Sequence, residues 1–170
     1  MTPLPKLLCS MKLLFIILFS LTQLSSQAQI TGRYDNSFGS RITLNADSTF
    51  RYRWNFDLAS SWNTGNWSVK NDTIYLISIL VYDTLKIKDD KGGFRDSLVY
   101  SLNEKSESIT NEEYVPNQLV SGGQGRKAIL LKLFYYGDRL FEFSKELKPL
   151  KKRVRGFMTS RKVVPWYRKL

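Results

Sequence analysis

Apolar and polar residues alternate along much of the chain after residue 29, which predicts antiparallel β-strands. The clearest segment is Thr49–Phe56, where aromatic side chains take every second position and polar side chains lie between them. Successive side chains of a strand point to opposite faces, so this pattern indicates a strand with one buried, aromatic face. Arg41–Leu44 also alternates, and the polar residues 45–48 that join the two segments predict a hairpin.

Three further strand pairs follow from the same criteria. They are Asn66–Val69 with Thr73–Leu80, Tyr82–Ile87 with Ser97–Leu102, and Ile129–Tyr136 with Arg139–Phe143. Both faces of Thr73–Leu80 are apolar, which predicts a central strand that is covered on both sides. Together the segments predict an all-β fold, an antiparallel meander that closes into a small barrel or a sandwich, because open sheet edges invite aggregation.

Two segments lack a strand pattern. Ser101–Glu113 tolerates a short helix, although Asn103 and Ser106 disfavour one. Residues 116–127 include a glycine-rich stretch that cannot pack into a core, and they predict a flexible loop. The hairpin that follows this loop is too small to be stable alone, so we expect residues 29–170 to form a single β domain.

The first residues have the pattern of a signal peptide. Lys12 precedes an apolar run at residues 13–21, which is far shorter than the about 20 residues that cross a bilayer. Ser26 and Ala28 match the small-x-small pattern that a signal peptidase accepts. We therefore expect residues 1–28 to be removed and the mature chain to have no transmembrane span.

The start and the compartment follow from the same region. Met11 makes a better start for a signal peptide than Met1, because Lys12 and the apolar run follow it directly. Cys9, the only cysteine, precedes the apolar run, whereas lipidation would need a cysteine at its end. We expect a periplasmic or extracellular domain that is held together by its core, without disulfides.

The composition removes several chemistries. The chain has no histidine, which takes away the commonest general base, the commonest zinc ligand and every Ser-His or Cys-His pair. The adjacent acids Asp89–Asp90 and Glu112–Glu113 lie in polar segments that are typical of solvated charge. Asp83, within a strand pattern, is the one acid that stands out. We expect a protein that is not an enzyme and that uses no cofactor or metal.

Positive charge is concentrated at the C-terminus. The net charge is +11, and residues 141–170 contain 10 basic and 2 acidic residues. Interleaved aromatic and aliphatic residues suit anionic lipid head groups or lipopolysaccharide, and export argues against nucleic acid as the partner. Lys151, Arg153 and Arg155, which would share one face of a strand, are the candidate anionic-surface residues. The alternative is that residues 145–170 form a basic tail with nothing more than a solvated charged face.

Four aromatic residues are candidates for a ligand site. Tyr52, Trp54, Trp62 and Trp67 could line a ligand cavity or a sugar-stacking surface. The alternative is core packing, because aromatic residues on one strand face dominate small β cores. Trp62 follows a predicted loop at residues 59–61, where the local sequence does not require burial, so it is the strongest candidate.

Four short motifs resemble the lipocalin-like small exported β domains of Gram-negative bacteria. They are Gly32-Arg33-Tyr34, Asp47-Ser48-Thr49-Phe50, Gly65-Asn66-Trp67 and Asn71-Asp72-Thr73-Ile74, within residues 30–80. Lipocalins open with Gly-x-Trp, where this chain has Tyr34, and the resemblance carries over no site residues. It implies an up-and-down barrel that holds a small apolar ligand.

Two functions are therefore expected. The first is an exported, non-enzymatic β domain that binds a small apolar ligand inside or an anionic envelope surface outside. The second is a structural or envelope-interaction protein whose barrel is fully packed.

Overall fold

The computed structural model describes residues 29–57, 59–120, 122–125, 132–156 and 159–170. The chain divides into two compact units, Met1–Thr31 and Gly32–Leu170. In the first unit only residues 29–31 are described, and the first two of them are helical. The predicted signal peptide, residues 1–28, lies outside the described residues. Every strand and the helix described below belong to the second unit.

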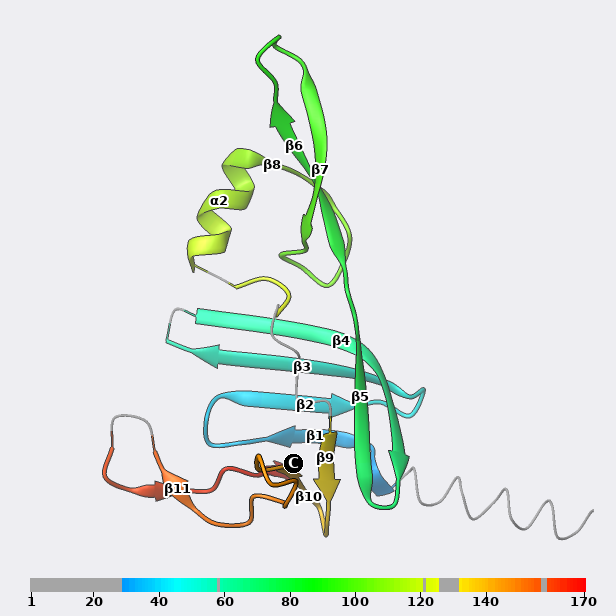
Figure 1. Cartoon of the computed structure of the whole chain (residues 1–170), viewed down its shortest axis with the longest axis vertical. Coiled ribbons are helices and arrows are strands. Elements are labelled where there is room, and N and C mark those ends of the chain that lie inside the picture. Colours follow the sequence, from blue (N-terminus) through cyan, green and yellow to red (C-terminus); the bar gives the residue numbers. More distant parts are fainter. Residues whose placement is uncertain (1–28, 58, 121, 126–131, 157–158) are drawn as a thin grey trace, which may run out of the picture. The chain divides into compact units, whose positions relative to one another are not determined.

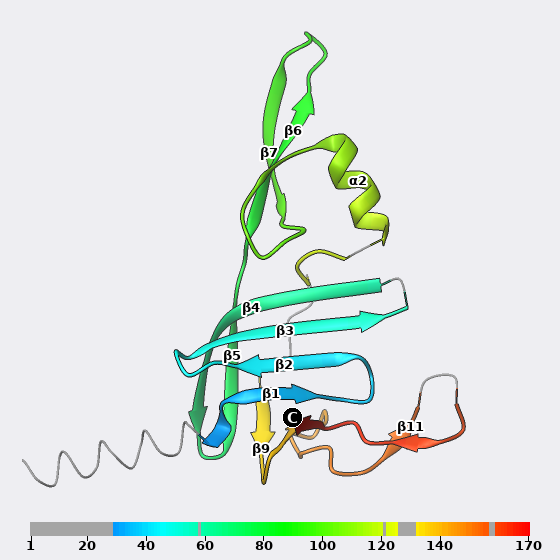
Figure 2. The same ribbon diagram turned by 180° about the vertical axis from the view of Figure 1, so that it is seen from behind.

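Eight antiparallel strands of the second unit close into a barrel (Figures 1 and 2). They are β1 (Gly32–Asp35), β2 (Ser40–Leu44), β3 (Thr49–Phe56), β4 (Ala59–Lys70), β5 (Thr73–Ile79), β9 (Lys132–Tyr135), β10 (Arg139–Glu142) and β13 (Tyr167–Lys169). Each strand pairs with the next in this order, and β13 pairs with β1 to close the ring. The all-β, antiparallel prediction is confirmed, and the sheet closes as a barrel.

Two insertions interrupt the meander. After β5 come β6 (Tyr82–Lys88), β7 (Phe94–Tyr100), β8 (Ser108–Thr110) and α2 (Asn111–Val120), and after β10 come β11 (Val154–Arg155) and β12 (Lys162–Val163). β6 pairs with β7 antiparallel and with β8 parallel, while β11 and β12 form a separate two-stranded hairpin. These insertions lie outside the barrel sheet, and the second one contributes to the candidate site.

Alternation along the strands fills the barrel. The fully buried apolar side chains come from seven of its strands: Tyr34, Ile42, Leu44, Phe50, Ile74, Leu76, Leu133, Leu140 and Tyr167. β3 has the bounds predicted for it, and its register places Phe50 opposite Leu44 and Tyr52 opposite Ile42. Burying such residues gains about 25 cal/mol for each Å² of apolar surface, which is the main stabilising contribution in a domain without disulfides.

Short polar turns set the register of the hairpins. Asn71 and Asp72, between β4 and β5, have φ angles of 49° and 57°, which fit a tight two-residue hairpin turn. Between β2 and β3, Asp47 Oδ1 accepts hydrogen bonds from Thr49 N at 3.0 Å and Thr49 Oγ1 at 2.6 Å. Both turns lie where the polar residues predicted them.

The outer face of β5 differs from the prediction. Ile74 and Leu76 are buried inside the barrel, but Ile77 is 65% exposed and Ile79 is 49% exposed. The prediction of a strand covered on both sides is therefore wrong for this face, although β5 does lie between two other strands. Apolar side chains on both faces could not distinguish a covered strand from a barrel strand with an apolar outer surface.

The helix also lies elsewhere than expected. α2 begins at Asn111, so residues 116–120 are helical and the loop predicted at 116–127 is wrong there. Glu113 Oε2 accepts a hydrogen bond from Thr110 N at 2.9 Å, and Thr110 Oγ1 accepts one from Glu113 N at 3.3 Å. This reciprocal pair is a capping box, which satisfies donors at the helix start. Pro116 lies inside the helix.

Candidate functional site

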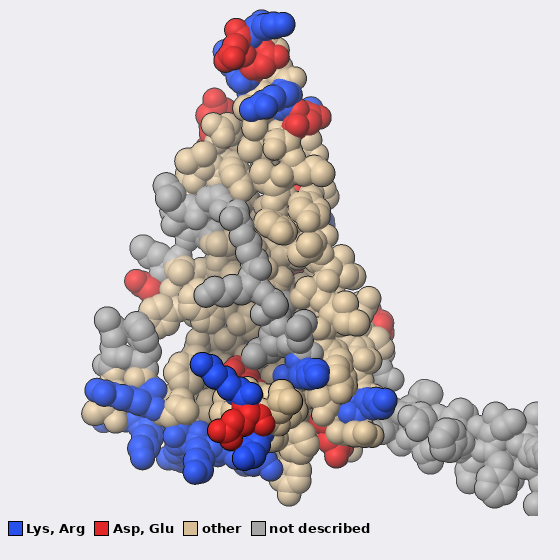
Figure 3. All heavy atoms as spheres, in the orientation of Figure 1, with Lys and Arg blue, Asp and Glu red and all other residues tan. Residues whose placement is uncertain are grey.

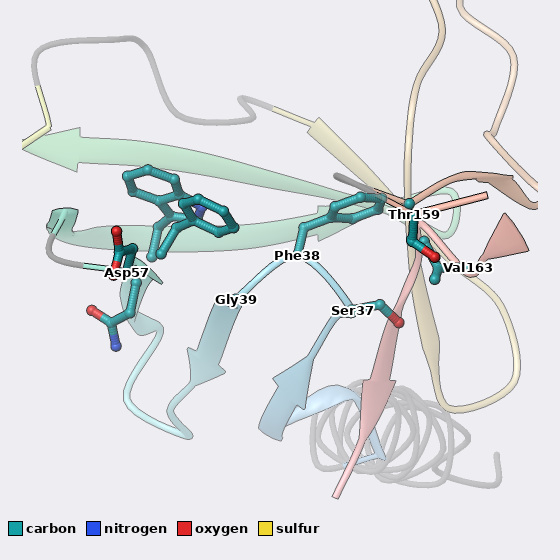
Figure 4. A pocket seen from close by; sticks show the side chains of 10 residues that line it. Ser37, Phe38, Gly39, Asp57, Thr159 and Val163 are labelled. Carbon is teal, nitrogen blue, oxygen red and sulfur yellow. The ribbon is translucent and has the colours of Figure 1, made fainter. Parts of the chain in front are cut away.

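A cleft of about 530 Å³ opens at the end of the barrel where β1 turns into β2 and β3 turns towards β4. Its walls come from the β1–β2 turn, the last residues of β3 and the β11–β12 hairpin (Figure 4). Apolar side chains contribute most of the lining, with Phe38, Trp54, Phe56 and Val163 as the largest. Segments that are far apart in sequence therefore form one concave surface.

β3 supplies the aromatic wall of the cleft. Alternation along the strand places Trp54 and Phe56 on the same face, and their rings stack with centroids 6.3 Å apart and planes 14° apart. Trp54 is half-buried, whereas Phe56 is 42% exposed at the strand end. The two rings form a nearly flat, solvent-accessible surface, which could stack against an apolar ligand.

The β1–β2 turn places Phe38 in the same cleft, with its ring on the side of Thr159 and Val163 (Figure 4). Asn36 Oδ1 accepts hydrogen bonds from Phe38 N at 2.9 Å and from Ser40 N at 3.0 Å, so the turn is locally closed. Asn55 N donates to Gly39 O at 3.0 Å and ties the turn to β3. Gly39 has a φ of 77°, and a Cβ there would lie 2.0 Å from Asn55 O, so this contact requires glycine.

The structure separates the four aromatic residues that were candidates from sequence. Tyr52 and Trp54 share the inner face of β3, and only Trp54 lines the cleft. Trp67 is buried near the opposite end of the barrel, where its Nε1 donates to Asn45 O at 2.9 Å. Trp67 therefore has a core position. Sequence reasoning missed Phe38 and Val163, which reach the cleft from other segments.

Trp62 has a different environment from the one predicted. The loop predicted at residues 59–61 is wrong, because β4 begins at Ala59. Trp62 pairs with the exposed residue Arg53, so its side chain points to the outer face of the barrel. There it is only 8% exposed, and its Nε1 donates to Leu102 O at 3.0 Å. The residue fixes the first insertion to the barrel rather than lining the cleft.

A second, smaller cleft of about 290 Å³ lies beside Trp62. Its charged residues already bind one another, since Glu104 accepts from Arg53 at 2.9 Å and from Arg51 at 2.5 Å. These ion pairs join the barrel to the first insertion. The charged groups of this cleft are paired within the protein, so the larger, more apolar cleft is the better candidate site.

A group of polar side chains lies next to the cleft residues along the strands. Ser40, which follows Gly39, shares a 3.2 Å hydrogen bond with the hydroxyl of Tyr52. Tyr167 Oη donates to Glu142 Oε1 at 3.4 Å. Burial raises the pKa of Tyr167 and of Glu142 above their ordinary values. Burial thus makes the charged form of the Glu142 carboxyl less favourable than it would be in water.

This raised pKa of Glu142 leads to a pH-dependent stability. A carboxyl that binds its proton more tightly in the folded state stabilises the fold at low pH, and this contribution is lost as the pH rises through the raised pKa. Glu142→Gln keeps an acceptor for Tyr167 and cannot ionise. We expect the variant to be more stable than wild type at neutral pH, with the difference vanishing in acid. Urea unfolding at a series of pH values measures this.

Glu146→Gln is the matched control, because Glu146 is exposed and, within the described residues, its carboxylate pairs with Lys148 alone. It should change the free energy of unfolding by less than about 1 kcal/mol. A gain for Glu142→Gln that is the same at acid and neutral pH would contradict the assigned cause.

The C-terminal cations do not lie on one strand face. Lys151 and Arg153 precede β11, so the prediction that they share a strand face with Arg155 is wrong. Lys151 Nζ lies over the ring of Tyr136, 5.0 Å from its centroid, and over that of Phe134 at 5.3 Å. The end of the predicted tail, residues 167–169, is the barrel strand β13. Lys and Arg side chains nonetheless gather around β11 (Figure 3).

Some cations of the described residues form ion pairs, whereas others, such as Lys88, Arg95 and those of the β11–β12 hairpin, form none. Outside the β11–β12 hairpin, ion pairs join Arg33 and Arg41 to Asp35, Arg51 and Arg53 to Glu104, Lys86 to Asp96, and Lys148 to Glu146. Residues 153–163, which include the β11–β12 hairpin, contain four cations that are all exposed: Arg153, Arg155, Arg161 and Lys162. Within the described residues none of these four has a carboxylate at ion-pair distance, so they leave a concentrated positive charge beside the cleft.

Two kinds of feature are absent from the part of the chain that the structure describes. The described residues contain no group of three or more Asp, Glu, His or Cys residues that could hold a metal ion. No helix within the described ranges is both long enough and apolar enough to cross a membrane.

Comparisons of the chain with protein-family models, curated proteins and solved structures found no match. The resemblance to lipocalin-like domains therefore stays a prediction.

Proposed function

We propose that this chain is a non-enzymatic binding protein that holds a small apolar ligand in the cleft at the end of its barrel. The observation that carries the proposal is the aromatic lining of a cleft of about 530 Å³. Small-molecule sites usually have volumes of roughly 300–1,000 Å³ and are lined mainly by apolar and aromatic side chains. The cleft has both properties.

The energetics of the cleft favour such a ligand. Phe56 keeps 42% of its surface exposed, and Trp54 and Phe38 are only half-buried. Covering one large apolar side chain completely gains about 1.5–3 kcal/mol, so a ligand that covers three partly exposed rings gains a fraction of this amount from each ring. The surrounding turn is held by hydrogen bonds, which reduces the entropy that binding must remove.

The proposal also includes export to the periplasm or the cell exterior, and a relationship to lipocalin-like domains. Export rests on the signal-peptide pattern of residues 1–28, and the relationship rests on the four motifs within residues 30–80. An exported barrel that carries an apolar molecule would keep that molecule soluble outside the cytoplasm.

The neutral fluorescent probe N-phenyl-1-naphthylamine tests the proposal. We expect its emission to rise on binding to the mature protein, and Trp54→Ala to weaken binding by about tenfold or more, equivalent to about 1.4 kcal/mol per tenfold. Phe56→Ala, at a more exposed position, provides a second variant that leaves the core intact. Phe94→Ala is the control, since Phe94 is 68% exposed on β7 and lies outside the cleft. Equal binding by all four proteins would place the probe elsewhere and overturn the proposal.

An anionic envelope surface is the second candidate partner. The observation that favours it is the set of exposed cations without ion pairs on and around the β11–β12 hairpin, namely Arg153, Arg155, Arg161 and Lys162. Cations near a membrane surface contribute about 1 kcal/mol each, so four together would hold the protein to anionic lipid at low salt.

A further inference from the structure

We infer that the ligand of the cleft is a single-chain amphiphile with an anionic group, whose apolar chain lies along Trp54 and Phe56 and whose anionic group binds Arg155. This inference rests on the proposed function and adds the charge and the orientation of the ligand. It depends on one feature of the fold, which is that a single hairpin supplies both part of the cleft wall and a group of unpaired cations.

The β11–β12 hairpin forms one wall of the cleft. Gly156, Thr159 and Val163 belong to the lining, and Arg155 directly precedes the first of them. Arg155 Nε donates to Thr159 O at 3.4 Å, which holds the guanidinium beside a residue that lines the cleft. The Nε of Arg155 therefore lies beside the backbone of Thr159, although the register places the side chain on the opposite face of the hairpin from Val163.

The guanidinium of Arg155 has donors to spare. Its side chain is exposed, and within the described residues no carboxylate lies at ion-pair distance from it. By contrast, Arg41 Nε binds Asp35 Oδ1 at 2.9 Å, and Arg41 is thus already neutralised by a partner. An arginine has five N–H donors in a planar fork, so Arg155 can still bind both oxygens of a carboxylate, sulfate or phosphate group.

Neighbouring cations strengthen the field around Arg155. Lys162 is the register partner of Arg155 on the hairpin. Arg161 N donates to Thr159 Oγ1 at 3.2 Å, and Arg161 O accepts from Gly156 N at 3.0 Å, so the cation of Arg161 is on the same tight turn. A cluster of one sign next to an apolar wall attracts an anion and orients it as it approaches.

The position of the charged residue in the lining predicts which way the anionic group of a bound ligand faces. Among the described residues of the lining, Asp57 is the one that carries a charge, and it directly follows β3. Figure 4 shows Asp57 on one side of Phe38, and Thr159 and Val163 on the other side. A bound anion would avoid the carboxylate and face the hairpin. The apolar part of the ligand would then extend past Phe38 towards the stacked rings of β3.

Three ligands of equal chain length and different charge test the inference. Decanoate, 1-decanol and decyltrimethylammonium would each displace N-phenyl-1-naphthylamine from the mature protein, below their micelle concentrations. We expect decanoate to bind most tightly and the cation most weakly. Arg155→Ser should weaken decanoate by about tenfold or more, since a hydrogen bond to a charged group is worth about 1.5–3 kcal/mol, and should leave 1-decanol unchanged.

Two further variants separate the role of Arg155 from general effects. Arg155→Lys keeps the charge but loses the planar fork, so its affinity for decanoate should lie between wild type and Arg155→Ser. Arg95→Ser removes one exposed cation from β7, outside the cleft, and should bind decanoate as wild type does. Circular dichroism of each variant confirms that the fold is retained.

The outcomes that overturn the inference are distinct from those that overturn the proposed function. If the probe binds in the cleft but the three ligands compete equally, the charge assignment is wrong and the apolar site remains. If neither the probe nor any ligand binds, both proposals are wrong. If the protein binds anionic vesicles but shows no preference for monomeric decanoate, the surface is the partner and the inference is overturned.

Discussion

Replacing Asp83 with alanine should lower the free energy of unfolding by about 3 kcal/mol and release the loop between β7 and β8. Asp83 is fully buried on β6. Its Oδ2 accepts a hydrogen bond from Leu102 N at 3.0 Å, and its Oδ1 accepts one from Glu107 N at 2.9 Å. Removing the carboxylate would leave two backbone donors without a partner, at a cost of about 1–3 kcal/mol for each one that stays buried.

Urea unfolding together with amide hydrogen exchange tests this expectation. The amides of Leu102 and Glu107 should lose protection in Asp83→Ala, while those of the β3–β4 hairpin keep theirs. Asp96→Ala is the control, since the one ion pair of Asp96 within the described residues is exposed, to Lys86, and its loss should cost less than about 1 kcal/mol. If Asp83→Ala were as stable as this control, the carboxylate would not organise the loop.

The sequence distinguished Asp83 from the other acids, but it did not predict which groups Asp83 would bind. The strand pattern around it distinguished it from the acid pairs in polar segments, and that distinction is confirmed by its burial. Its hydrogen-bond partners lie 19 and 24 residues further along the chain. No local pattern specifies where such a loop returns, so its role in holding the loop could be found only from the structure.

Elements that depend on neighbouring residues were predictable. The bounds of β3 follow from its alternating aromatic residues, and the β2–β3 and β4–β5 hairpins follow from short polar turns. The start of α2 was readable as well, because Thr110 and Glu113 have the spacing of a capping box. That signal was missed because Pro116 and the glycines after it indicated a loop.

Features that depend on distant residues were not predictable. Trp62 is buried on the outer face of β4, where its Nε1 donates to Leu102 O, and this contact spans 40 residues. The cleft joins Phe38 to Val163 through the pairing of β11 with β12 and the closure of the barrel by β13. Alternation identifies the faces of each strand, but it does not say which faces meet or which one stays exposed.

Gly65→Ala should be more damaging than a change of one methyl group suggests. Gly65 lies at an inward-facing position of β4, where this long strand curves as it pairs with β3 and then β5 (Figure 1). A Cβ at this position would lie 2.0 Å from Ile77 O and 2.9 Å from Phe50 Cε1. The closer of these atoms is backbone and cannot rotate away, so β5 would have to move. We expect a loss of about 3 kcal/mol or more.

Thermal and urea unfolding of Gly65→Ala, compared with Gly92→Ala, measures the effect of this close approach. Gly92 lies at the tip between β6 and β7, with a φ of 81° and nothing within 4 Å of the added Cβ. Alanine there meets only backbone strain, which costs about 1–2 kcal/mol. Gly65→Ala should therefore be clearly less stable than Gly92→Ala, and the amides that pair β4 with β5 should exchange faster. Equal losses in the two variants would mean that the barrel accommodates a side chain at Gly65, and that glycine is not required for the strands to approach there.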